Sequence, residues 1–353
     1  MRSPVKFSLM STKYRVEHFY NPNDALGEGP LWDIATSTLY WIDITRGAFH
    51  RLHRPTGKHE RIEIGEKIGV LALREKGGLV MAVKNGFAFW HEGKEGKDRL
   101  EYVASPYGLD HPYFRMNDGA VDCKAQSRIY PGRFWAGSMV DNDSGYDPAE
   151  TPGTLYRLDP DGSVYEMVQG VATTNGELKL VCFGGLISTG LVSKILRLSF
   201  RPLIPSSGPN TGVVWSPDNK TMYVGDSPTK KIFAWDFDAE TGNISNRRVF
   251  FDVAKYWPEA FPDGAAVDEE GCLWWALWDG EKIIRIAPSG DILAEIPIPA
   301  LRPTAPAFFG DNYDEIVITS AGEGVKDTHP LSGDLFRVSK VGVRGMKKYL
   351  FQG

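Results

Sequence analysis

Cysteine is scarce in this chain of 353 residues, which has only Cys123, Cys182 and Cys272. Three cysteines cannot build the disulfide framework of a small secreted domain, and none of them stands in a Cys-x-x-Cys pair. The cysteine content therefore favours a reducing compartment. We expect a cytoplasmic protein.

Long apolar runs and basic clusters are lacking as well. The longest uncharged apolar stretch, Leu180 to Val192, has 13 residues, whereas a membrane-spanning helix needs about 20. Near the N-terminus, Pro4 and Lys6 stand where the apolar core of a secretion signal would lie. The net charge is −5, with no basic stripe. We expect neither a membrane nor nucleic acid as a partner, and no obligate protein partner is evident.

Several catalytic signatures are also missing. The sequence has no Gly-x-Ser-x-Gly elbow, no P-loop, no dinucleotide-binding glycine motif before a helix, and no His-Glu-x-x-His. Serine nucleophile chemistry and nucleotide binding are therefore not supported.

What the chain does have is a repeat of short aromatic and β-branched runs separated by turn residues, among them 38 glycines and 23 prolines. Six units share this rhythm, each with an inner strand, a turn, a second strand and a third. They begin at "GPLWDIATSTLYWIDI", "GVLALREKGGLVMAV", "GAVDCKAQSRIYPGRFWAGSM", "GVVWSPDNKTMYVGDS", "GAAVDEEGCLWWALW" and "PAFFGDNYDEIVITS". One such sheet cannot bury both faces alone, so radial stacking predicts an all-β, six-bladed β-propeller. A β-sandwich with coincidental similarity is the alternative.

Oxygen-bearing side chains precede several inner strands, where a propeller places residues at one mouth of its central channel. Glycine follows each of these residues directly or within two residues, which allows a tight turn. They are Glu28, Asn117, Asp118, Asn175, Asn210 and Asp263, and Arg115 stands in the same stretch as Asn117. Each acidic or amide residue alone would be read as a turn cap. Together they predict a site for one divalent cation: calcium, magnesium, manganese or zinc.

Five stretches make the chain resemble the gluconolactonase/regucalcin family, also called senescence marker protein, of six-bladed propellers. They are "LGEGPLWDIATSTLYWIDI", "RMNDGAVD" with "GRFWAGSM", "VVWSPDNKTMYVGDS", "DFDAETGNISNRRVFFD" and "FPDGAAVDEEGCLWWALWDGEKIIRI". The resemblance implies metal-dependent hydrolysis of sugar-acid lactones such as gluconolactone. It also implies metal ligation by Glu28, Asp263 and an asparagine before the Trp215 strand, with substrate contact by Arg115 and Asn117.

The residues themselves suggest how a lactone could react. A metal can polarise the carbonyl and acidify a water, and Asp263 can take the proton and return it to the ring oxygen. Arg115 can hold hydroxyls or developing negative charge.

The alternatives to a lactone hydrolase are a non-catalytic calcium-binding regulatory propeller and a propeller scaffold that binds another protein. Most tryptophans are expected in blade packing, although Trp278 could wall a sugar site.

Two segments depart from the family pattern within a single expected domain at 15–350. One is "CKAQSRIY" at 123–130. The other, at 177–211, is apolar and basic. It follows Asn175 and contains Asn210, so either asparagine could be the ligand, with Asn175 favoured by its upstream context "GVATTNG". A structureless loop of this length inside a compact domain is unusual. It is either an active-site lid or translated non-coding sequence, and its composition favours the second. The family's acidic sugar contact after "AGSM" has three candidates here, Asp141 to Asp143.

Overall fold

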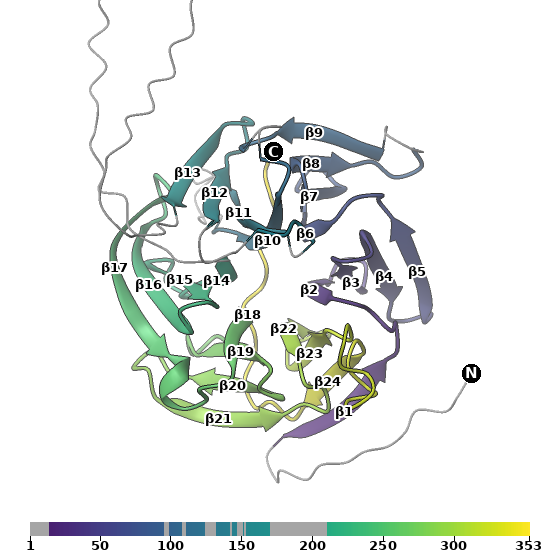
Figure 1. Ribbon diagram of the computed structural model, residues 1–353, viewed down its shortest axis with the longest axis vertical. Helices are drawn as coiled ribbons and strands as arrows, with labels where there is room; N and C mark the ends of the chain where they lie inside the picture. Colours follow the sequence, from purple (N-terminus) through teal and green to yellow (C-terminus); the bar gives the residue numbers. More distant parts are fainter. Residues whose placement is uncertain are drawn as a thin grey trace, which may run out of the picture.

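A computed structural model describes residues 14–94, 99–107, 111–123, 132–141, 143–146, 151, 153–169 and 210–353. Six antiparallel sheets of four strands each surround a central axis (Figure 1). The predicted six-bladed β-propeller is thus confirmed. Within this described part, no helix has the length and hydropathy that a membrane span requires.

The first three blades follow each other along the chain, with the innermost strand first. Blade 1 contains β2 (Gly27–Asp33), β3 (Thr38–Asp43), β4 (Ala48–His53) and β5 (Lys58–Glu63). Blade 2 contains β6 (Ile68–Leu73), β7 (Leu79–Val83), β8 (Gly86–Trp90) and β9 (Leu100–Ala104). Blade 3 contains β10 (Phe114–Val121), β11 (Phe134–Val140), β12 (Thr154–Leu158) and β13 (Val164–Gln169).

The last three blades complete the ring. Blade 4 contains β14 (Asn210–Trp215), β15 (Thr221–Asp226), β16 (Lys231–Asp238) and β17 (Asn243–Asp252). Blade 5 contains β18 (Phe261–Val267), β19 (Leu273–Trp278), β20 (Lys282–Ile286) and β21 (Ile292–Pro297). Blade 6 contains β22 (Pro303–Phe309), β23 (Glu315–Ser320), β24 (Leu335–Ser339) and β1 (Arg15–Tyr20). Because β1 comes from the N-terminal part and pairs with β24, it joins the two ends of the ring.

Each blade has a fourth, outer strand that the three-strand repeat units did not include. In blade 4 this strand is β17, whose residues are mostly exposed or half-buried. An outer strand packs only one edge against its own sheet and keeps much of its surface in water. Its hydrophobic alternation is therefore weak, and sequence patterns detect it poorly.

The hydrophobic core is divided among the contacts between neighbouring blades. Six buried clusters are formed, and each one joins residues of two adjacent sheets. Trp135 of blade 3, for example, packs with Met222 of blade 4. Radial stacking of blades is thus what removes the apolar faces from water.

The stretches "DGAVD" (118–122) and "DGAAVD" (263–268) are two copies of one phrase, and the last aspartate of each supports its blade from inside. Asp122 accepts hydrogen bonds from Arg133 Nε (2.7 Å) and Trp135 Nε1 (3.0 Å). In the second copy, Asp268 accepts from Trp274 Nε1 (2.9 Å) and Arg285 Nε (2.9 Å). The phrase therefore recurs because it ties an aromatic strand to its own blade.

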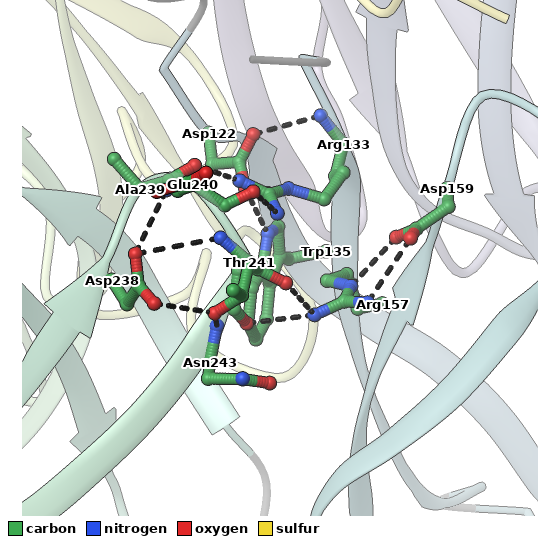
Figure 2. Close-up of polar contacts among 11 residues, drawn as sticks. Asp122, Arg133, Trp135, Arg157, Asp159, Asp238, Ala239, Glu240, Thr241 and Asn243 are labelled. Atoms are coloured by element: carbon green, nitrogen blue, oxygen red, sulfur yellow. Dashed lines mark hydrogen bonds and ion pairs between the residues drawn. The ribbon is translucent and has the colours of Figure 1, made fainter. Parts of the chain in front are cut away.

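The Asp122 cluster also reaches the next blade, as Figure 2 shows. Arg133 Nη2 donates to Ala239 O (2.5 Å), and Arg157 Nη1 donates to Gly242 O (2.8 Å), both in the turn between β16 and β17. Gly242 has a φ of +65°, and a Cβ there would lie 2.3 Å from Arg133 Nη1. Blade 3 thus holds the outer turn of blade 4.

The segment 124–131, which contains most of the first predicted insertion, lies outside the described residues. So do residues 170–209, which include positions 177–209 of the second. Residues 210 and 211, also assigned to that insertion, form the beginning of β14.

We expect Asp122→Asn to lower the free energy of unfolding by about 3 kcal/mol, because it leaves the buried Arg133 without its ionic partner. Denaturant titration monitored by tryptophan fluorescence measures this change. Asp311→Asn, at an exposed turn position, is the matched control. Equal stabilities of the two variants would show that the Asp122 cluster does not hold the blade.

Candidate functional site

Each of the six inner strands is interrupted near its beginning by a break in register with its neighbour. In β2 the break lies between Glu28 and Leu31, and in β18 between Pro262 and Ala265. A β-bulge of this kind redirects side chains away from the regular alternation of a strand. Asn175 lies outside the described residues. The other polar residues expected at the channel mouth lie at or beside these breaks, within the inner strands rather than before them.

The breaks bring four predicted site residues together from three blades. Glu28, Arg115, Asn117 and Asp263 all line one cavity of about 480 Å³. This volume lies within the range of roughly 300–1,000 Å³ that is usual for small-molecule sites. Trp278, the candidate wall of a sugar site, lines the same cavity.

The carboxylates of the cavity repel one another. Burial raises the pKa of Glu28 well above its ordinary value, and the nearby carboxylates of Asp263 and Asp118 raise it further. Burial also raises the pKa of Asp263 well above its ordinary value, with Asp118 adding to the shift and Arg115 opposing it. A bound cation would offset this repulsion, and carboxylate oxygens are the donors that hard divalent cations prefer. The residues present therefore fit a divalent cation.

Arg115 and Asn117 form the polar wall beside these carboxylates. Arg115 is buried, and its Nη1 donates to Asn117 Oδ1 (2.8 Å) and Met116 O (3.0 Å). These bonds fix the guanidinium and the amide relative to each other. The wall therefore offers a preorganised cation at the cavity surface.

Among the three acidic-contact candidates after "AGSM", Asp141 is buried and already paired. It accepts hydrogen bonds from Lys67 Nζ (2.5 Å) and Lys84 Nζ (3.2 Å), and it lies 3.9 Å from Arg115 Nε. Burial acts to raise the pKa of Asp141, but the two lysines outweigh it and hold the pKa below the ordinary value. Asp141 thus supports Arg115 from behind the cavity.

Thr211 is a cavity residue that sequence analysis missed. The structure describes only the backbone of Asn210, which pairs with Asp226 at the beginning of β14, and Asn175 lies outside the described residues. Thr211 directly precedes Gly212 and lines the cavity, with its Oγ1 donating to Pro262 O (3.2 Å). Its place directly before "GVVW", where the family pattern has asparagine, was the available signal. The identity of the asparagine ligand stays a prediction.

A second acidic cluster lies at the turn between β18 and β19. Ligand atoms of Asp268, Glu270 and Cys272 come within 4.8 Å of one another. Arg285 Nη2, however, pairs with Asp268 (2.7 Å) and with Glu270 (2.6 Å). One guanidinium thus pairs with both carboxylates of this cluster and ties the turn to β20.

Comparison with known proteins places this geometry in a family. Residues 26–178 and 194–322 match the SMP-30/Gluconolactonase/LRE-like region. The chain is 30% identical to regucalcin of Xenopus laevis over 96% of this chain and 99% of that protein. It is 30% identical to a 6-deoxy-6-sulfogluconolactonase of Pseudomonas putida, covering 93% and 95%. The solved structure of a luciferin-regenerating enzyme superposes with a TM-score of 0.74 at 26% identity, covering 94% and 96%.

We expect Glu28→Gln to stabilise the metal-free protein. A carboxyl group with a raised pKa binds protons more tightly in the folded state, so its contribution to stability falls as the pH rises through the raised value. In chelator, the melting temperature of the wild type should therefore decline from mildly acidic to mildly alkaline pH more than that of Glu28→Gln. Differential scanning calorimetry tests this, with exposed Glu259→Gln as control. Parallel pH profiles for Glu28→Gln and the wild type would contradict it.

Proposed function

The chain belongs to the SMP-30/gluconolactonase/LRE-like family, and we propose that it hydrolyses lactones of sugar acids at the mouth of its central channel. The observation that supports this most strongly is the cavity in which the carboxylates of Glu28 and Asp263 face Arg115 and Asn117. Carboxylates alone would suit an ion-binding protein. The cationic and amide groups beside them suit a polyhydroxylated substrate with a reacting carbonyl.

We infer that Glu28 and Asp263 hold one divalent cation, together with an oxygen from the segment that leads into β14. When bound, such a cation supplies Lewis-acid polarisation of the lactone carbonyl and lowers the pKa of water. Calcium, magnesium, manganese and zinc all accept oxygen ligands of this kind.

Asp263 takes the role of proton carrier. Its carboxylate accepts a proton from the attacking water while the water oxygen bonds to the carbonyl carbon. The same proton then passes to the ring oxygen as the carbon–oxygen bond of the lactone breaks, which yields the hydroxy acid. Burial raises the pKa of this carboxylate, whereas ligation of a cation makes it a weaker base, so Asp263 shares the roles of ligand and proton carrier.

Arg115 and Asn117 orient the substrate. The guanidinium can stabilise negative charge that develops on the carbonyl oxygen, and the amide can bind a hydroxyl. Trp278 and Phe261 add apolar surface to the cavity, against which the carbon–hydrogen face of a sugar ring can pack.

We expect Asp263→Asn to lower lactonase activity on the order of 10²- to 10⁴-fold, because it removes the proton carrier. Gluconolactone hydrolysis followed with a pH indicator, with and without chelator, measures this effect. Glu28→Gln is the comparison variant, because excess divalent cation should partly restore the lactonase activity that this substitution removes. Near-normal turnover of Asp263→Asn at saturating cation would remove Asp263 from the mechanism.

We expect Arg115→Ala to lower kcat/KM by about 10²-fold, the scale of a lost donor to developing charge. Its affinity for the divalent cation, measured by isothermal titration calorimetry, should stay within about twofold of the wild type, since Arg115 contacts substrate and not cation. A parallel loss of cation binding would show instead that Arg115 only maintains the shape of the cavity.

A further inference from the structure

The C-terminal residues 340–353 form a strap that crosses the middle of the ring, visible in yellow in Figure 1. One side of the strap is attached to blade 5, where Met346 N donates to Val267 O (3.0 Å). The other side is attached to blade 2, where Phe351 N donates to Leu73 O (2.9 Å). The residues between these attachments must span the central channel.

Beneath the strap, a cavity of about 50 Å³ lies on the channel axis, because inner strands of all six blades line it. Lys348 and Tyr349 of the strap line it as well. Among the described residues in this lining, Asp118 is the one anion and Lys348 the one cation, and the other side chains carry no charge. An opposite pair of charges thus shares an otherwise uncharged cavity.

Asp118 connects this cavity to the proposed site. Its Oδ2 accepts a hydrogen bond from Gly212 N (2.6 Å), and its Oδ1 accepts one from Gly119 N (2.7 Å). Gly212 follows Thr211, which lines the larger cavity, so Asp118 fixes the backbone at the beginning of β14. The charge of Asp118 also acts on Glu28 and Asp263.

We propose that Lys348 is a positioning residue, which acts through the channel as the counter-ion of Asp118 and thereby holds the beginning of β14 against the carboxylates of the site. Without Lys348, no cation in the described lining of this cavity would offset the charge of Asp118, which also repels Glu28 and Asp263. The cavity exceeds the space that one water requires, so water can bridge the pair.

The environment of Lys348 agrees with this assignment. Burial lowers the pKa of Lys348, and the charge of Asp118 opposes that shift. The neighbouring Lys347 is exposed and provides a matched lysine on the same strap. The consequence for catalysis rests on the proposed lactonase function, whereas the charge pair itself does not.

A double-mutant cycle tests the pair without any assay of activity. Lys348→Met and Asp118→Asn should each lower the melting temperature by several degrees, since each leaves the other charge uncompensated in the channel. The double variant should lose clearly less than the sum of the two single losses. Lys347→Met, the control, should have the same melting temperature as the wild type. The pairing is overturned if the two losses are additive or if Lys348→Met melts at the wild-type temperature. If both single variants fail to fold, a double variant that also fails to fold overturns it.

Kinetics then separate positioning from general support of the fold. Lys348→Met should lower kcat for gluconolactone on the order of tenfold with little change in KM, and it should change kcat less than about twofold when Asp118 is already asparagine. Equal effects in both backgrounds would assign Lys348 a structural role only. If the wild-type chain hydrolyses no lactone, the proposed function fails, while the melting cycle still decides on the pair.

Discussion

The constraint on which the rest of this structure depends is the bulge near the beginning of every inner strand. A regular strand alternates its side chains between two faces, and in a propeller both faces pack against neighbouring blades. The break in register releases residues such as Glu28, Asn117 and Asp263 from that alternation. The same local irregularity, repeated around a ring, brings polar groups from distant parts of the sequence to one cavity.

Gathering these groups has an energetic consequence. Glu28 and Asp263 are buried, and each has a pKa above its ordinary value. Such a cluster weakens the metal-free fold. The six apolar contacts between blades and the buried aspartate clusters within them supply the stability that tolerates it. Functional sites commonly carry this kind of local destabilisation, which is balanced elsewhere in the structure.

The architecture could be predicted because each blade repeats a strong local signal. Buried inner strands, tight turns and aromatic second strands are visible in the sequence, and the propeller follows from the need to cover their faces. The outer strand β17 was missed because a mostly exposed strand has little hydrophobic alternation. Glu28, Arg115, Asn117 and Asp263 were predicted as site residues from their place near the beginning of an inner strand and from the family resemblance, and the structure brings them to one cavity.

The roles of Thr211 and Lys348 could not be predicted from local sequence patterns. A threonine has no distinctive signal of its own, and its place in the cavity follows from the register of β14 with β15. Lys348 lies far along the chain from every other site residue, and only the path of the strap across the ring brings it to the channel. The sequence by itself determined the blade, its repeat and the polar residues at the beginning of several inner strands, because these depend on local pattern. Only the tertiary structure decided which side chains share a cavity and which charges face each other, because closing the ring sets those distances.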